Sequence, residues 1–172
     1  VSALSPGVMG MTGLETSEVL RGVVNHIHPC CVVVIDSLSA ASIQRIGTTI
    51  QISDTGIRPG SGLDNQRQAI DESTMGCPVV AIGVPTVVHT MAIIAESFHL
   101  LGEQNPKISA KSRQATLESL QEKLFSLFGG DLVVTPKEVD KLIPQTAKII
   151  AGGITQAVHP GANSENYTRY MQ

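Results

Sequence analysis

A run of β-branched residues near the start of the chain constrains its fold more than any other feature. Residues 31–35 read Cys-Val-Val-Val-Ile without a polar interruption, and Asp36 follows them. Such a run is typical of a strand that is covered on both faces inside a parallel sheet. Functional residues of open α/β sheets lie at the carboxyl ends of strands. The sequence therefore predicts that Asp36 ends a central strand, either in a functional site or as the N-cap of a following helix.

Helix and strand patterns alternate along the chain. The predicted helices cover residues 15–28, 39–46, 85–101, 113–127 and 135–154, and the predicted strands cover residues 1–4, 31–36, 48–53 and 77–84. This order predicts a three-layer α/β fold, with a mixed or mostly parallel sheet flanked by helices. We expect one domain over residues 1–172 with a softer segment at 102–112. Because the chain opens on an apparent strand end without Met, we expect it to be the C-terminal part of a longer protein.

Composition argues against several classes of function. The net charge is −3, Trp is absent and aromatic residues make up 3% of the chain. These values argue against a nucleic-acid surface and against base stacking. The sequence has no apolar run of the roughly 18 residues that a membrane helix needs. The glycines at 7, 10 and 13 do not match a phosphate or dinucleotide motif, so no cofactor is predicted. Cys30, Cys31 and Cys77 are expected to be buried thiols in a reducing, cytoplasmic compartment.

Four stretches of the sequence, taken in order, resemble the germination proteases of spore-forming bacteria. They are residues 6–16, residues 35–38 running on to 49–62, residues 78–88 and residues 133–140. The resemblance covers nearly the whole chain but only about the C-terminal half of the family's sequence. It implies a fold like that of hydrogenase maturation proteases.

The resemblance also implies an activity. It implies an endopeptidase that initiates degradation of small acid-soluble spore proteins in the spore core during germination. The family is oligomeric and made as a zymogen, and this chain has no counterpart of its propeptide. Asp36 matches one of the two essential Asp residues of an atypical aspartic-type protease, and the other belongs to an upstream segment. Ala41 stands where a basic residue is expected, and His89 stands where the family tends to carry an acid.

An aspartic mechanism needs two carboxylates that share one proton. Asp54 is the first candidate for a second acid within this chain, and an Asx turn is the competing explanation. Glu15 is a weaker candidate, because an acid in the first turn of a helix is favoured by the dipole anyway.

Three residues of the glycine-rich loop 56–62 are candidates for binding substrate: Arg58, Gly60 and Ser61. Arg58 could hold an acidic group of the substrate, or it could be a solvated loop residue. His89 is a weak candidate for a base or a metal ligand, and a surface residue is the plainer explanation.

Two other classes of function stay open. The sheet type also serves ligand-binding and phosphorolytic domains, and the chain could be a non-catalytic fragment. For the chain as given we expect half a site, no protein cleavage by itself and a sheet that lacks a strand. The uncovered strand edge predicts a homo-oligomer.

Overall fold

The computed structural model describes residues 1–7, 9–60, 67–104, 109–130, 132–159 and 161. The chain divides into two compact units, residues 1–133 and 134–172. The candidate site residues that the structure describes all lie in the first unit. Four residues of the predicted soft segment, 105–108, lie outside the described residues.

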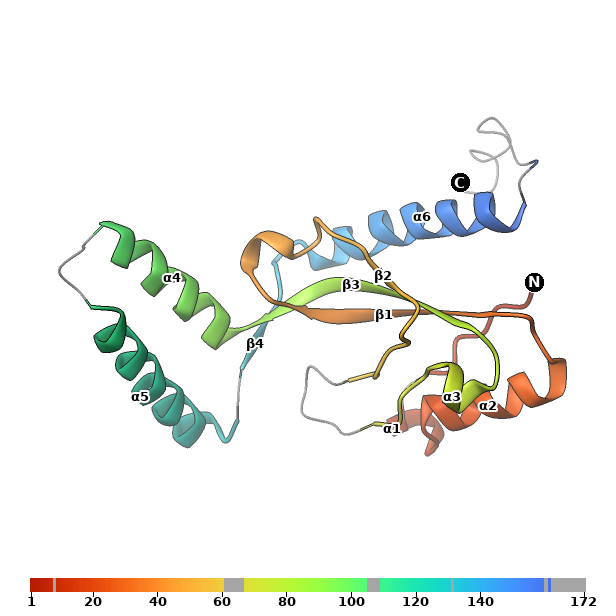
Figure 1. Cartoon of the computed structure of the whole chain (residues 1–172), viewed down its shortest axis with the longest axis horizontal. Helices are drawn as coiled ribbons and strands as arrows, with labels where there is room; N and C mark the ends of the chain where they lie inside the picture. Colours follow the sequence, from red (N-terminus) through yellow and green to blue (C-terminus); the bar gives the residue numbers. More distant parts are fainter. Residues whose placement is uncertain (8, 61–66, 105–108, 131, 160, 162–172) are drawn as a thin grey trace. The chain divides into compact units, whose positions relative to one another are not determined.

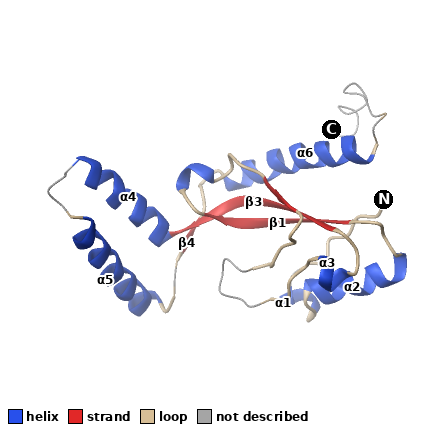
Figure 2. Ribbon diagram, viewed as in Figure 1, coloured by secondary structure: helices blue, strands red, loops and turns tan. Residues whose placement is uncertain are grey.

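The first unit is built on an open mixed sheet (Figure 2). Strand β3 (Val79–His89) lies between β1 (Val32–Ala40) and β2 (Gln51–Ser53), and β4 (Val133–Val134) also pairs with β3. The pair β1 and β3 is parallel, whereas β2 runs antiparallel to β3. Helices flank this sheet, so the predicted α/β class is confirmed. The likeness to hydrogenase maturation proteases stays a prediction.

The central strand is β3 and not β1, which corrects the sequence-based expectation. Within the part of the chain that the structure describes, β1 pairs with β3 alone. Val33 and Ile35 on β1 are 44% and 52% exposed, whereas β3 is buried over most of its length. Asp36 does not end its strand either, because β1 continues for four residues to Ala40.

Three further boundaries differ from the prediction. Residues 1–4 are not a strand, and the expected helix at 39–46 is only the 3-10 turn η1 (Ile43–Arg45). The expected helix at 85–101 begins at Thr90, because Pro85 lies inside β3. Leu38 pairs with Pro85 and the next residue pairs with Val87, so the register shifts at the proline. A proline cannot donate to the ladder, which explains an irregularity at this point.

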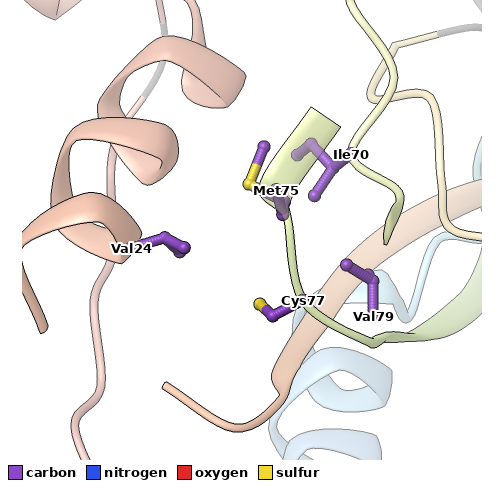
Figure 3. Packing of buried hydrophobic residues seen from close by; sticks show 5 residues of the cluster. All are labelled: Val24, Ile70, Met75, Cys77 and Val79. Atoms are coloured by element: carbon purple, nitrogen blue, oxygen red, sulfur yellow. The ribbon is translucent and has the colours of Figure 1, made fainter. Parts of the chain in front are cut away.

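Two short helices and one long helix complete the compact part of the first unit. They are α1 (Met9–Thr12), α2 (Thr16–Ile27) and α3 (Glu72–Met75), with α2 and α3 side by side in Figure 1. The predicted helix at 15–28 is confirmed, and its N-cap is Glu15. Figure 3 shows the core beneath these helices, formed by Val24, Ile70, Met75, Cys77 and Val79. Cys77 is buried as predicted, but Cys30 and Cys31 are exposed, which corrects that part of the expectation.

The helices α4 (Thr90–Gln104) and α5 (Ala110–Phe128) form an antiparallel pair that follows β3 (Figure 1). The predicted helix at 113–127 is thus confirmed. Leu127, near the end of α5, is 74% exposed.

The second unit holds one long helix, α6 (Val139–Val158), which contains Pro144. It begins later than the predicted start at residue 135. In the parts of the chain that the structure describes, no helix is both long enough and apolar enough to span a bilayer.

Candidate functional site

Asp36 lines a cavity of about 740 Å³ in the first unit. Its walls come from the N-terminal segment, α2, β1 and the two ends of the loop between β2 and α3, with one residue each from β3 and β4. The lining residues are Leu4, Pro6, Gly7, Thr16, Leu20, Val32, Val33, Val34, Ile35, Asp36, Ser37, Leu38, Ser39, Arg58, Pro59, Gly60, Arg67, Ile70, Val87 and Val133.

The cavity runs along the edge of β1 that has no strand partner among the described residues. Eight consecutive residues of this strand, Val32 to Ser39, line it. Because successive side chains of a strand point to opposite faces, contact with all eight places the cavity beside the strand edge. Ser39 Oγ is buried there and has no hydrogen-bond partner among the described residues.

Asp36 lies half-buried midway along this edge. Its Oδ1 accepts a hydrogen bond of 2.8 Å from the backbone N–H of Ser37. Burial raises the pKa of Asp36 above its ordinary value of 3.8, while the Ser37 hydrogen bond and the positive charge of Arg67 act in the opposite direction. A carboxyl group whose pKa is raised by burial inside a cavity is a candidate for proton transfer.

A closed loop carries the two arginines to the cavity. The backbones of Ile57 and Ile70 exchange hydrogen bonds of 2.9 and 2.8 Å, which join the two ends of the loop. Gly56 makes this closure possible, because its φ is +80° and a Cβ there would lie 2.4 Å from the carbonyl oxygen of Ile70. Arg58 follows the first end of the loop, and Arg67 precedes the second.

The structure brings together some of the predicted site residues. Asp36, Arg58 and Gly60 line one cavity, with Arg58 exposed and Asp36 half-buried. Ser61 lies outside the described residues. Whether these residues act on a substrate stays a prediction.

Asp54 does not join Asp36. It follows β2, which is exposed and separated from β1 by β3. Because β2 runs antiparallel to β3, its carboxyl end points toward the end of the sheet where β3 begins, away from the position of Asp36. Its place at the end of a predicted strand made Asp54 a candidate second acid, but the direction of β2 carries it away from Asp36. Asp54 is exposed and does not line the cavity.

Glu15 and His89 also lie outside the lining of the cavity. Glu15 caps α2, and its N–H donates to Glu18 Oε2 at 3.3 Å. His89 is the last residue of β3 and not a helix residue. Among the residues that the structure describes, no group of three or more His, Cys, Asp or Glu side chains could hold a metal ion.

Sequence reasoning missed Arg67. This residue lies in a stretch without helix or strand periodicity, and nothing in its surroundings marked it. Only the closure of the loop between Ile57 and Ile70 brings it to the cavity. Its neighbour Gln68, which contacts α2, was missed for the same reason.

A sequence model of one family, described as germination protease, matches residues 1–115 and 108–171. The chain belongs to the germination protease family. Similar curated relatives include the germination proteases of Caldanaerobacter subterraneus subsp. tengcongensis and of Clostridium acetobutylicum, with 42% and 39% identity over 181 residues. The germination protease of Bacillus subtilis is 38% identical over 210 residues.

These relatives are longer than this chain. Each comparison covers 99% of the chain but only 55–57% of the relative. The chain therefore spans little more than half the length of the germination proteases that it matches.

Proposed function

We propose that this chain is part of an endopeptidase that initiates the degradation of small acid-soluble spore proteins during germination. Membership of the germination protease family supports this proposal. The observation that carries it is Asp36, a carboxyl group in a cavity where burial raises its pKa. The protein would act in the cytoplasm of the spore core.

The reaction is peptide hydrolysis by a water that two carboxyl groups activate. One carboxylate takes a proton from the water, and the resulting hydroxide attacks the peptide carbonyl carbon. The second carboxyl group donates its proton to the leaving nitrogen as the C–N bond breaks. Two carboxyl groups close together share one proton, because both cannot ionise. Asp36 is one member of this pair.

The second carboxylate of the pair comes from polypeptide outside this chain. Asp54 lies across β3 from the cavity, and among the described residues Asp36 is the one acidic residue in the cavity lining. Among the described residues β1 has a strand partner on one edge alone, so a further strand could pair with its other edge near Asp36, and the greater length of the relatives supports such a segment. The chain by itself should therefore not cleave protein.

Substrate is held by the loop that carries Arg58 and Gly60. Arg58 is exposed at the cavity, and a guanidinium group suits an acidic side chain because it offers paired N–H donors. Gly60 has a φ of +73° and presents no side chain, so an extended peptide could pass close to its backbone. Ser61 belongs to the same proposed surface by sequence.

A cleavage assay with a small acid-soluble spore protein tests the proposal. The longer protein encoded by the complete reading frame should cleave it, and the chain of residues 1–172 alone should not. In the longer protein, Asp36→Asn should abolish cleavage while Asp54→Asn leaves it unchanged. Cleavage that survives in Asp36→Asn but is lost in Asp54→Asn would reverse the assignment of the site.

A further inference from the structure

The segment that carries Arg67 is anchored from three directions. On one side, the hydrogen bonds between Ile57 and Ile70 close the loop three residues after Arg67. On a second side, the Arg67 side chain lies along Gly60, where a Cβ would be 3.4 Å from Arg67 Nε. On the third side, Gln68 is held by α2.

The contacts between Gln68 and α2 form a compact hydrogen-bond cluster. Arg21 donates from its Nη2 to Gln68 Oε1 at 2.7 Å, and Ser17 Oγ lies 3.2 Å from the same oxygen. The backbone N–H of Gln68 donates to Glu15 Oε2 at 3.3 Å. Ser17 is only 2% exposed, so its hydroxyl is fixed inside the protein. A buried hydroxyl and a charged donor on one side-chain oxygen hold Gln68 in a defined place.

The charges that face Asp36 are few. Among the described residues that line the cavity, the charged ones are Asp36, Arg58 and Arg67, while α2 contributes the uncharged Thr16 and Leu20. Arg58 and Arg67 come from opposite ends of one loop, and they differ in how firmly they are held. Arg58 is exposed, whereas Arg67 is partly buried and anchored.

We infer that Arg67 is a positioning residue for Asp36, and that Gln68 holds it in place through Ser17 and Arg21 on helix α2. A fixed cation in the same cavity as a half-buried carboxyl group favours the ionised form of that group, which is the form that can accept a proton from water. Loss of the anchor would let the guanidinium move toward solvent, where water and salt screen its charge. Helix α2 therefore supports the ionisation of Asp36 without touching it.

This inference rests on the proposed function only in assuming that the Asp36 carboxylate accepts a proton during catalysis. The test below measures the ionisation of Asp36 and needs no protease activity, so the inference and the proposed function can fail separately. The titration of the Asp36 carboxyl carbon is followed by NMR in the chain of residues 1–172. Arg67→Gln should raise the titration midpoint of Asp36. Arg67→Lys keeps the positive charge, so its midpoint should stay close to the wild-type value.

Two matched controls separate position from charge. Arg58→Gln removes the same charge from the same cavity, and Arg45→Gln removes it from an exposed turn outside the cavity. Arg58→Gln should raise the midpoint less than Arg67→Gln, and Arg45→Gln should leave it unchanged. Equal shifts in Arg58→Gln and Arg67→Gln would overturn the inference, because they would show a general effect of net charge.

The role of Gln68 is tested by a double-mutant cycle. Gln68→Ala should raise the midpoint in the wild-type background, and it should add nothing in the Arg67→Gln background because its effect passes through Arg67. A shift of the same size in both backgrounds would show that Gln68 acts by some other path.

A measurement on the unaltered chain keeps the inference testable if a variant does not fold. Added salt weakens the attraction between a cation and a carboxylate near the surface. The midpoint of Asp36 should therefore rise as the NaCl concentration increases. A midpoint that stays constant or falls would contradict the proposed role of Arg67.

Discussion

Burial raises the pKa of Asp36, and the positive charge of Arg67, which lines the same cavity, partly opposes that rise. The two residues come from separate parts of the chain, one from strand β1 and one from the loop that follows β2. Their meeting depends on the closure of that loop between Ile57 and Ile70. The ionisation of the candidate catalytic group is thus set by two distant segments together.

The raised pKa of Asp36 predicts how the stability of the chain varies with pH. A carboxyl group whose pKa is higher in the folded state destabilises the fold when it is ionised, at pH values above the folded pKa. This penalty decreases as the pH falls through the folded pKa toward the ordinary value. Asp36→Asn should therefore be more stable than the wild type at neutral pH, with the difference shrinking in acid. Urea unfolding at a series of pH values measures this, and an Asn variant that is less stable at pH 7 would contradict it.

Asp71 should behave in the opposite way. Its pKa is lowered by hydrogen bonds from Ser73 and Thr74, because it caps α3. A lowered pKa gives stability that is present above the ordinary value and is lost as the pH falls through the folded pKa. Asp71→Ala should therefore reduce stability at neutral pH and have less effect in acid. Urea unfolding at the same series of pH values measures this difference in stability. A destabilisation by Asp71→Ala that grows as the pH falls would contradict the prediction.

Gly56 should tolerate no side chain. A Cβ at this position would lie 2.4 Å from the carbonyl oxygen of Ile70 and 2.8 Å from Cα of Asp71, both backbone atoms. Gly56→Ala should cost about 1–2 kcal/mol for its positive φ and about 1–3 kcal/mol more for the overlap.

Gly13→Ala is the matched control, because Gly13 also has a positive φ but no atom within 4 Å of the added Cβ. Equal losses of unfolding free energy in the two variants would show that the contact with Ile70 has no role. A larger loss in Gly56→Ala should also be accompanied by displacement of Arg67, seen as a raised midpoint in the Asp36 titration.

The open edge of β1 predicts that the chain associates with itself. Val33 and Ile35 expose apolar surface on a strand that has one neighbour in the described structure, and such edges pair with other chains. Light scattering should show a homo-oligomer, and Val33→Lys should shift it toward monomer. Leu127→Lys, at an exposed apolar position on α5, is the control. If that variant alone gave the monomer, the association surface would lie on α5.

Periodic sequence patterns predicted the helices and strands whose apolar residues gather on one face. The predicted helices at 15–28 and 113–127 lie within a few residues of α2 and α5. The β-branched run located β1, and its carboxylate does lie in a cavity. The place of β1 in the sheet was not predictable in this way, because an apolar run does not reveal how many neighbours a strand has.

The remainder of the site depends on tertiary contacts. Asp54 follows a strand, as predicted, but the sequence does not give the direction in which β2 pairs with β3. Arg67 lies in a stretch without periodicity, and its place depends on the closure between Ile57 and Ile70. Pro85 looked like a helix start, yet the long central strand β3 accommodates it through a register shift beside Leu38.

The role of Asp36 as one of two proton-sharing carboxyl groups is tested most directly by the kcat/KM of the longer protein on a small acid-soluble spore protein. Arg58→Gln serves as the control: it should raise KM with little change in kcat, whereas Asp36→Asn should lower kcat itself. Removal of a general acid or base lowers the rate by about 10²–10⁴-fold. We predict a loss of this size in Asp36→Asn with the fold intact. A kcat/KM within tenfold of the wild type in a folded Asp36→Asn protein would contradict the assignment of Asp36 to catalysis.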